Sequence, residues 1–291
     1  MNNKNTVCIS TGFKNLDAVL DGGLYSNFYV LGAISSLGKT TFIIQMADQM
    51  AYNGYDVLFF SLEMSRKEII AKSISRHTLQ LISTHSNSFC GARTAREIIL
   101  GSQFKNYSET EKKIVDDAIN SYSQYAKHLF INEGLGDTNI AQIKHTVEKH
   151  LSFTGKTPVV IIDYLQIIKP SITNFSDKQN MDNFVTELKK ISKEYNTPVI
   201  AISSFNRANY KEPVTMEAFK ESGAIEYLSD VLIGLQFNGI SKKDFDLNRA
   251  KMENPRNIEL VILKNRNGRS GDKIKYKYYA PYNYFKENNS V

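Results

Sequence analysis

The feature that most constrains the fold is a short loop, Ala33–Thr40, between a strand-like run and a helical pattern. The loop reads Ala-Ile-Ser-Ser-Leu-Gly-Lys-Thr and follows the apolar run Phe28–Leu31. Behind it, an apolar residue recurs every four positions from Phe42 to Met50, until Asn53-Gly54 supplies a stop. A strand, a glycine-containing loop and a helix N-terminus in this order form a cradle for phosphate groups.

The end of this loop carries the groups that a nucleoside triphosphate with Mg²⁺ requires. Gly38 lets the backbone approach the phosphates, Lys39 brings an ammonium to the β- and γ-phosphates, and Thr40 offers a hydroxyl to the metal. The first position is Ala33, where the usual pattern has glycine. The predicted nucleotide-binding residues are Ala33, Ser35, Ser36, Leu37, Gly38, Lys39, Thr40 and Thr41.

Four further runs rich in Val, Ile and Phe predict buried strands, because they lack the alternation of half-exposed strands. They are Val57–Phe60, Val159–Ile162, Val199–Ile202 and Val231–Leu235. Helical patterns lie between the runs, and a clear one extends from Phe184 to Tyr195. Strands that alternate with helices predict an α/β fold with a mostly parallel central sheet and helices on both faces.

The C-terminal part changes character. Ile258–Leu263 is typical of a strand, Asn267-Gly268 of a turn, and Ile274–Tyr278 alternates apolar residues with lysines. This pattern predicts a β-hairpin with one apolar and one basic face. The stretch Leu79–Leu129 gives no clear assignment. No linker composition divides the chain, so we expect one domain with a flexible start, a core and a tail, at residues 1–8, 9–285 and 286–291.

The composition narrows the class of protein. Hydrophobic residues make up 42% and charged residues 23% of the chain, which excludes a disordered, collagen-like or coiled-coil protein. No apolar run approaches the ~18 residues that a membrane helix needs, and the first ten residues lack the apolar stretch of a signal peptide. Cys8 and Cys90 stand apart without metal-ligand spacing. We expect a cytoplasmic protein with no membrane partner.

Polar side chains follow three of the predicted strands. Asp163 comes directly after Val159–Ile162, where a carboxylate can hold the Mg²⁺ of a phosphate-binding loop. Glu63 follows the strand after the loop's helix and could accept a proton from a water that attacks the γ-phosphate. Each acid alone could also be a loop residue or a helix cap. Ser204 follows Val199–Ile202 and could sense the γ-phosphate.

Charge is unevenly distributed along the chain. The net charge is +6, and residues 241–277 hold 11 Lys and Arg against 5 Asp and Glu. Such an excess suits a polyanion, either nucleic acid or nucleotide phosphates, or it protects a sheet edge. Lys264 and Arg266 stand at the predicted turn, from which a cation could reach the nucleotide of a neighbouring subunit. Alternatively, the turn is simply basic.

Seven segments, in this order and spacing, resemble the ATPase domain of DnaB-type replicative helicases. They are Ser10–Asp17, Gly38–Thr41, Ser61–Ser65, Ile162–Gln166, Asn206-Arg207, Glu221–Glu226 and Lys264–Gly268. The match extends from about Ile9 to about Tyr284, nearly the whole chain. Its most specific parts are Asp-Tyr-Leu-Gln and Glu-Ser-Gly-Ala-Ile-Glu, which are rarer than the phosphate-binding loop.

The resemblance implies a RecA-like P-loop fold and a hexameric ring of identical subunits around single-stranded DNA. Lys264 and Arg266 would then act on the adjacent subunit's nucleotide. DNA would be held by its backbone rather than its bases. The residues expected to contact it are Arg207, Lys220, Glu221 and Gly223.

The resemblance also implies ATP and Mg²⁺ as ligands and assigns roles around them. Lys39 and Thr40 would bind the phosphates and Mg²⁺, Asp163 would hold the metal, and Glu63 would activate water. Ser204 stands where the family usually has glutamine, and a hydroxyl is too short to do the same work. Coupling of hydrolysis to DNA is therefore expected to differ.

The match begins almost at Met1, so we expect the family's N-terminal domain and linker helix to be absent and the ring to be weakened. Two other functions remain open at this point. One is a RecA- or clock-type ATPase that binds DNA or protein without strand separation. The other is an interaction module that binds nucleotide without catalysis.

Overall fold

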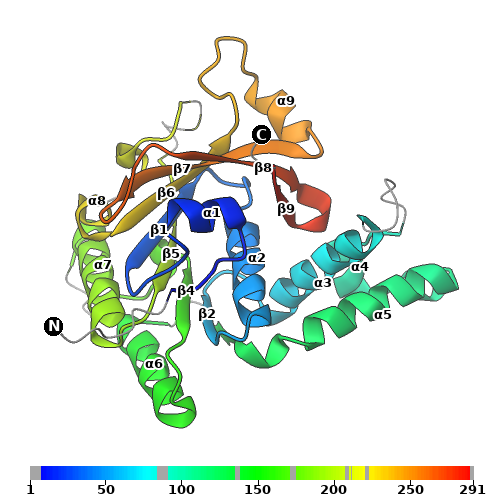
Figure 1. Ribbon diagram of the computed structural model, residues 1–291, viewed down its shortest axis with the longest axis horizontal. Helices are drawn as coiled ribbons and strands as arrows, with labels where there is room; N and C mark the ends of the chain where they lie inside the picture. The colour runs from blue at the N-terminus through cyan, green and yellow to red at the C-terminus, as the bar shows by residue number, and fades with distance from the viewer. Residues whose placement is uncertain are drawn as a thin grey trace.

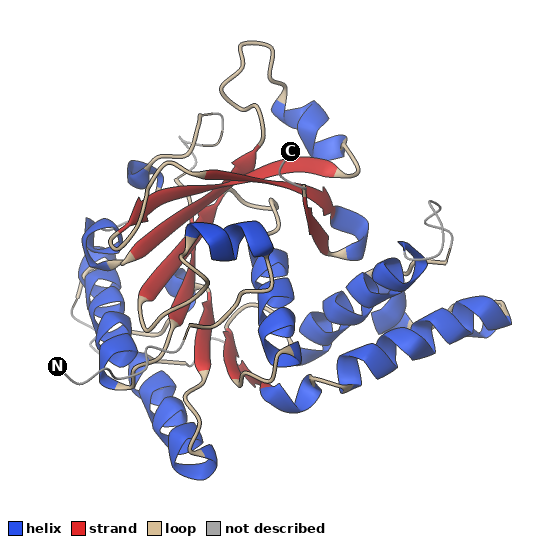
Figure 2. Cartoon of the chain, viewed as in Figure 1, coloured by secondary structure: helices blue, strands red, loops and turns tan. Residues whose placement is uncertain are grey.

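The computed structural model describes residues 8–83, 91–134, 138–170, 175–206, 210, 212–219 and 223–288. In these residues, one sheet of nine strands crosses the molecule in the order β3-β2-β4-β5-β1-β6-β7-β8-β9 (Figures 1 and 2). The neighbours from β3 to β6 pair in parallel, and those from β6 to β9 pair antiparallel. The predicted α/β class with a mostly parallel sheet is confirmed.

The parallel part of the sheet consists of β1 (Phe28–Ala33), β2 (Val57–Ser61), β3 (Leu129–Glu133), β4 (Val159–Asp163), β5 (Val199–Ser204) and β6 (Val231–Phe237). The five predicted strands are confirmed, and each extends one or two residues further toward its carboxyl end. The sequence did not predict β3. It lies at the sheet edge with Leu129 and Ile131 buried and Phe130 exposed, so it lacks a continuous apolar run.

Helices cover both faces of the sheet, as predicted. Because crossover connections are right-handed, steps in opposite directions along the sheet place their helices on opposite faces. The steps β1→β2→β3 carry α2 (Lys39–Tyr52), α3 (Arg66–Ser83), α4 (Ala95–Leu100) and α5 (Glu109–Ser123). The opposite steps β3→β4→β5 carry α6 (Ile140–Thr154) and α7 (Asp177–Glu194). Figure 1 shows the two groups on either side of the sheet.

The remaining helical segments that the structure describes are short. They are α1 (Lys14–Val19), α8 (Gly223–Leu228), α9 (Leu247–Met252), and the 3-10 turns η1 (Phe104–Asn106), η2 (Ala126–His128), η3 (Leu165–Ile167), η5 (Met216–Ala218) and η6 (Ala280–Tyr282). No helix in the described ranges is long and apolar enough to cross a membrane.

The predicted C-terminal hairpin is confirmed, and a further strand follows it. β7 (Arg256–Asn265), β8 (Lys273–Tyr279) and β9 (Tyr284–Glu287) continue the sheet. In β8, Ile274 and Tyr276 are buried and Lys275 is exposed, as the alternation predicts. Gln45 of α2 ties β9 to the first long helix, because its side chain bonds both the N–H and the C=O of Phe285 at 2.8 Å.

The described part of the stretch Leu79–Leu129, which was unassigned from sequence, contains the end of α3, α4, α5 and the 3-10 turns η1 and η2. Thr94 with Glu97 begins α4, and Ser108 with Glu111 begins α5, each as a reciprocal capping box. A Ser or Thr followed three residues later by Glu is the sequence signature of this cap. Both helices therefore had a readable start signal.

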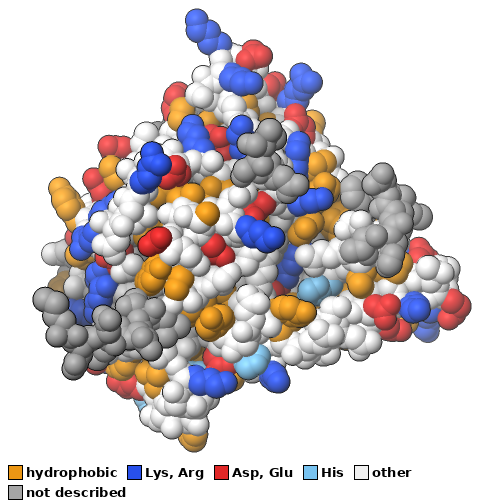
Figure 3. Space-filling view, in the orientation of Figure 1, with side chains coloured by type: hydrophobic (Ala, Val, Ile, Leu, Met, Phe, Trp, Pro, Cys, Tyr) orange, Lys and Arg blue, Asp and Glu red, His pale blue; other side chains and the backbone are white. Residues whose placement is uncertain are grey.

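The region with the excess of basic residues lies around α9 and the β7–β8 strands. In the space-filling view, Lys and Arg side chains gather at the top of the molecule, interspersed with acidic ones (Figure 3). This is the part of the sheet beyond β6, away from β2 and β4.

Candidate functional site

A cavity of about 380 Å³ opens at the carboxyl ends of β1, β2, β4 and β5. Its lining residues are Ser35, Ser36, Gly38, Lys39, Thr40, Thr41, Glu63, Met64, Lys72, Asp163, Tyr164, Ser204 and Tyr278. The register makes these strand ends level, because Ser61 pairs with Asp163 and Ala33 pairs with Ser204. The sheet thus brings together predicted site residues from four distant segments.

The loop before α2 has the shape that its glycine allows. Gly38 has φ +98°, and a Cβ there would come within 2.9 Å of the Tyr278 ring. No side chain caps the N-terminus of α2 at this position, so its first amides remain free to bind an anion. Of the predicted loop residues, Ala33 and Leu37 are buried beneath the loop and do not line the cavity.

Lys39 is held inside the loop. Its Nζ donates to the carbonyl oxygens of Ala33 at 3.1 Å and of Ile34 at 3.3 Å. Burial lowers the pKa of Lys39 to about 8, against the opposing effect of the carboxylates of Asp163 and Glu63. An ammonium with neutral partners in a partly desolvated site gains strongly from an incoming phosphate.

Among the described residues, Asp163 is the one with both of its buried side-chain oxygen atoms unpartnered. It is 1% exposed, and by geometry neither carboxylate oxygen has a hydrogen-bond partner among the described residues. Burial raises its pKa to about 6; the Thr40 hydroxyl, which lies close by but outside good hydrogen-bond geometry, opposes this rise, and Glu63 adds to it. Native proteins rarely leave a buried carboxylate unpaired, and carboxylate and hydroxyl oxygens are ligands that Mg²⁺ prefers.

The donor set fits a metal held together with a phosphate. Among the described residues, no group of three or more His, Cys, Asp and Glu could hold a metal ion. A cation beside Asp163 and Thr40 would therefore take its other ligands from phosphate oxygens and water, as Mg²⁺ does in nucleotide sites. Glu63 is exposed to the cavity, where a proton acceptor can meet a water.

Polar residues also lie at the carboxyl end of β5. Ser204 lines the cavity, as predicted for a residue near the γ-phosphate. The preceding Ser203 is buried, and its hydroxyl accepts a hydrogen bond from Gln166 at 3.0 Å. The Gln166 amide oxygen is itself buried, with no hydrogen-bond partner in the described ranges.

Lys264 and Arg266 lie at the other end of the sheet. β7 runs antiparallel to β6, so Asn265 pairs with Val231 at the start of β6. The six residues of β1 separate this edge from the cavity edge by roughly 16 Å. The structure therefore does not bring these two cations into the cavity of their own chain.

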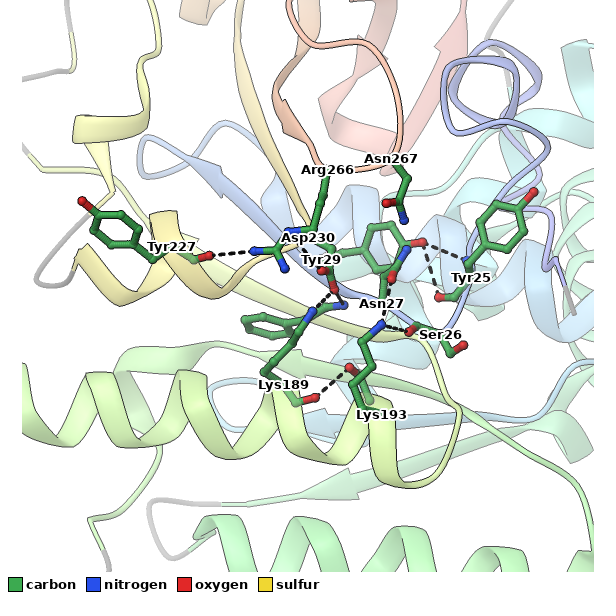
Figure 4. A network of polar contacts seen from close by, with 12 residues as sticks. Tyr25, Ser26, Asn27, Tyr29, Lys189, Lys193, Tyr227, Asp230, Arg266 and Asn267 are labelled. Carbon is green, nitrogen blue, oxygen red and sulfur yellow. Dashed lines mark hydrogen bonds and ion pairs between the residues drawn. The ribbon is translucent and has the colours of Figure 1, made fainter. Parts of the chain in front are cut away.

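At that end, the last turn of α8 holds Lys264 and Arg266; Figure 4 shows the contact of Arg266 with Tyr227. Lys264 Nζ donates to the carbonyl oxygens of Glu226 and Tyr227, and Arg266 donates to that of Tyr227 at 3.2 Å. Arg266 Nε lies 3.8 Å from Asp230, although more than half of the Arg266 side chain is exposed. The carbonyl end of a helix is a favourable place for cations.

Asp230 anchors this arrangement. It is 3% exposed and accepts hydrogen bonds from the N–H of Phe28 at 2.9 Å and from Lys189 of α7. Its own carbonyl accepts the N–H of Arg266 at 2.8 Å. Nearby, Lys193 of α7 donates to the Ser26 carbonyl at 2.9 Å (Figure 4).

The predicted DNA contacts fall mostly on undescribed positions. Arg207, Lys220 and Glu221 lie outside the described residues. Gly223 is described as the exposed first residue of α8, so the segment expected to contact DNA leads directly into the helix that holds Lys264.

Sequence reasoning missed several residues of the cavity wall, chiefly Lys72 and Tyr278. Tyr278 was assigned only to the apolar face of its strand. Lys72 lies in α3, where a single lysine usually marks a solvated face, so the sequence carried no signal for it.

The phosphate-binding loop follows β1 of a parallel sheet, and the unpaired Asp163 lies at the end of β4, two strands away. Together these features define a nucleotide-binding protein of the P-loop class. The family can be stated more closely. The chain belongs to the DnaB-like helicase C terminal domain family, whose model matches residues 8–287. The resemblance inferred from the seven segments is confirmed.

Curated relatives agree with this family. The chain is 29% identical to a probable replicative DNA helicase of Trieres chinensis, over 95% of this chain and 56% of the relative. It is 27% identical to the replicative DNA helicase DnaB of Mycoplasma genitalium, over 93% of this chain and 54% of the relative. The chain therefore spans about half the length of the curated relatives it matches.

Solved structures agree on the fold. One that is described as an ATPase domain superposes with a TM-score of 0.80 at 24% identity, covering 97% of this chain and 92% of that one. A second solved structure, a DnaB-like replicative helicase described with its interactions with primase, superposes with a TM-score of 0.80 at 24% identity. The match covers 98% of this chain and 64% of that one. The predicted RecA-like fold is confirmed, and the helicase family is favoured over a recombination or clock-type ATPase.

Proposed function

We propose that this chain is the motor domain of a DNA helicase and hydrolyses ATP with Mg²⁺. The observation that carries the proposal is the unpaired, buried carboxylate of Asp163, placed in one cavity with Lys39, Thr40 and Glu63. A structural acid in a folded protein would be paired. An acid whose partner is a bound metal ion can be unpaired when that ion is absent.

The residues divide the work of phosphoryl transfer between them. Lys39 exchanges its carbonyl partners for oxygens of the β- and γ-phosphates, and the free amides of α2 bind the phosphates behind it. Thr40 and Asp163 hold Mg²⁺, which when bound neutralises charge that develops on the phosphates. Glu63 accepts the proton of the attacking water, and Ser204 stands at the strand end nearest the γ-phosphate.

The proposal includes a site shared between two copies of the chain. Lys264 and Arg266 lie at the opposite edge of the sheet from the cavity of their own chain, so a role at a nucleotide requires a neighbour. A ring in which each copy presents this edge to the next cavity supplies it, and a hexamer is the arrangement we propose. A cation provided in trans neutralises transition-state charge.

Single-stranded DNA is the proposed nucleic-acid partner, bound by residues 207 and 220–223 through its phosphates. The net charge of +6 supports binding to a polyanion. The cytoplasmic location predicted from the sequence stays part of this proposal.

The experiment is an ATP hydrolysis assay with and without single-stranded DNA, comparing the wild-type chain with Lys39→Ala. We expect hydrolysis that DNA stimulates and that the substitution abolishes. A rate that ignores both DNA and Lys39 would overturn the proposal. Tight nucleotide binding without turnover would instead indicate an interaction module, and turnover without strand displacement on a forked duplex would indicate a non-unwinding ATPase.

A further inference from the structure

Asp230 fastens the turn that carries Arg266 to the rest of the chain. The main-chain N–H of Arg266 donates to the Asp230 carbonyl at 2.8 Å, and Arg266 Nε lies 3.8 Å from Asp230 Oδ1. The other carboxylate oxygen, Oδ2, accepts the N–H of Phe28 at 2.9 Å and a hydrogen bond from Lys189. Figure 4 shows Asp230 between Lys189 and Arg266. The two oxygens of this carboxylate therefore face different parts of the fold.

A purely structural role would use only one of these oxygens. Oδ2 alone ties the start of β1 to α7, through Phe28 and Lys189. Oδ1 adds nothing to that tie, because it faces Arg266, whose side chain is 52% exposed. An exposed guanidinium at this distance contributes little to stability. The second oxygen therefore indicates a role in orienting Arg266.

Asp230 is also the shared counter-charge of several cations. Burial lowers the pKa of Lys264; Arg266 adds to this effect and Asp230 opposes it. Burial likewise lowers the pKa of Lys193, and Asp230 again opposes the fall. Without the carboxylate, like charges would face one another across this turn, and the exposed Arg266 would relieve the repulsion by moving outward.

The contacts of Arg266 hold one side of its guanidinium. Nη2 donates to the Tyr227 carbonyl at 3.2 Å, and Nε faces Asp230. A guanidinium carries five N–H donors, and more than half of this side chain is exposed, so donors remain for an anion from outside. An arginine with a fixed inner edge and an open outer edge is preorganised to meet a phosphate.

We propose that Asp230 is a positioning residue for Arg266, which orients the guanidinium toward the nucleotide of a neighbouring copy. Asp230 acts through Arg266 and does not touch a nucleotide itself, because it lies at the amino end of the parallel strands, away from the cavity of its own chain. This inference rests on the proposed function in requiring that Arg266 act on a neighbour. It adds the residue that sets the geometry of that contact.

The test compares ATP turnover, with Mg²⁺ and single-stranded DNA, and ADP affinity in the wild type and in Asp230→Asn. The amide keeps an acceptor for the N–H of Phe28 but removes the charge beside Arg266. We expect turnover to fall roughly 10- to 100-fold, the effect of misplacing a reacting group by about 1 Å. ADP affinity should be unchanged, because the cavity of the same chain is intact.

A second variant separates positioning from stability. Asp230→Asn also leaves Lys189 without its charged partner, whereas the double variant Asp230→Asn/Lys189→Met removes both charges of the pair. Replacing both partners of a buried pair restores stability that the loss of one partner removes. We expect the melting temperature to recover in the double variant and turnover to stay low, since the carboxylate beside Arg266 is still missing.

Asp48→Asn is the matched control. Asp48 is 3% exposed, as Asp230 is, and forms a buried ion pair with Arg76. It lies in the second half of α2, outside the residues that line the nucleotide cavity. Asp48→Asn should lower the melting temperature and leave turnover close to that of the wild type.

Mixing shows which half of a shared site Asp230 serves. The double variant keeps its own cavity, and a Lys39→Ala chain keeps an intact turn, so part of the activity should return when the two are mixed. Mixing the double variant with Arg266→Ala should restore nothing, because neither chain then presents an intact turn.

A folded double variant with wild-type turnover overturns the inference. So does a failure to regain activity with Lys39→Ala in an assay where Arg266→Ala does regain it, because Asp230 would then act on its own cavity. If Asp230→Asn does not fold, the double variant carries the test. Full turnover of Arg266→Ala would contradict the proposed function instead, which an inactive Arg266→Ala beside a fully active double variant would leave intact.

Discussion

Two buried aspartates, one at each end of the parallel strands, have opposite surroundings. Asp163 at the carboxyl end is 1% exposed, and its carboxylate has no hydrogen-bond partner in the part of the chain that the structure describes. Asp230 at the amino end is 3% exposed and bonds Phe28 and Lys189, with Arg266 close by. The carboxylate therefore lacks hydrogen-bond partners at one end of the sheet and has them at the other.

The difference distinguishes a ligand site from a scaffold. Asp230 is satisfied by groups of the chain itself, and the Arg266 beside it stays more than half exposed. In the proposed function, a cation and an anion supplied from outside complete the cavity around Asp163. Substitutions at the two ends should therefore fail in different ways.

The largest effect is expected at the exposed cation of the amino end. Arg266→Ala should lower the steady-state ATPase rate by roughly 10³- to 10⁵-fold, the worth of an arginine supplied to phosphoryl transfer. Nucleotide binding to the free chain should persist, because Arg266 lies away from its own cavity. Turnover and binding measured on the same sample check both statements.

Mixing tests whether the two ends belong to one composite site. Arg266→Ala and Lys39→Ala chains are each expected to be inactive, but a mixed assembly contains sites with an intact Lys39 from one chain and an intact Arg266 from the next. Part of the activity should return on mixing. Full activity of Arg266→Ala alone would show that the cavity works without a neighbour.

Removing the proposed proton acceptor should come next in size. Glu63→Gln is expected to reduce turnover by roughly 10²- to 10⁴-fold, the usual contribution of a general base, while ATP affinity changes little. Single-turnover hydrolysis and equilibrium binding separate the two quantities. Unimpaired hydrolysis would mean that another group receives the proton.

The two aspartates also give a direct comparison of stability. Asp230→Asn leaves Lys189 without its charged partner, and breaking such a pair costs about 3 kcal/mol or more. Lys189 is only 17% exposed in its side chain, so water compensates little. Urea unfolding should show a lower midpoint for Asp230→Asn, and an unchanged midpoint would mean that the pair contributes no net stability.

How much the sequence could predict differs between these ends as well. The continuous apolar runs identified five buried strands, and order along the chain identified Gly38, Lys39 and Asp163, because strand ends and helix starts are local features. β3 was not predicted, because an edge strand with Phe130 exposed has no continuous apolar run. The position of Lys72 in the cavity wall was not predicted, because the direction of its side chain depends on how α3 packs, and no local pattern encodes that packing.

The turn at Lys264 and Arg266 shows a further limit of local reasoning. Its basic character and its strand context are readable, but its distance from the cavity follows only from the antiparallel pairing of β7 with β6. The attachment of both side chains to the end of α8 could not be predicted either, because residues 226 and 264 meet only in the folded sheet. Arg207, Lys220 and Glu221 remain predictions.

The smallest effect, and the one with an unusual sign, concerns Asp163. Burial raises its pKa to about 6, whereas an unfolded chain has about 3.9. The folded protein therefore binds this proton more tightly than the unfolded chain does, and that contribution to stability is lost as pH rises through 6. Without ligands, Asp163→Asn should be more stable than the wild type at pH 8, and its advantage should shrink by about 1.4 kcal/mol by pH 5.

Urea unfolding at pH 5 and pH 8 measures this difference, and Asp116→Asn on the surface of α5 is the matched control. Mg²⁺ with ADP should reverse the order at pH 8, because the ligand stabilises only a chain that binds it and the amide lacks the charge that Mg²⁺ needs. An Asn variant that is less stable than the wild type without ligand, and equally stabilised by Mg²⁺–ADP, would make Asp163 a structural residue like Asp230. The two ends of the sheet would then no longer differ in kind.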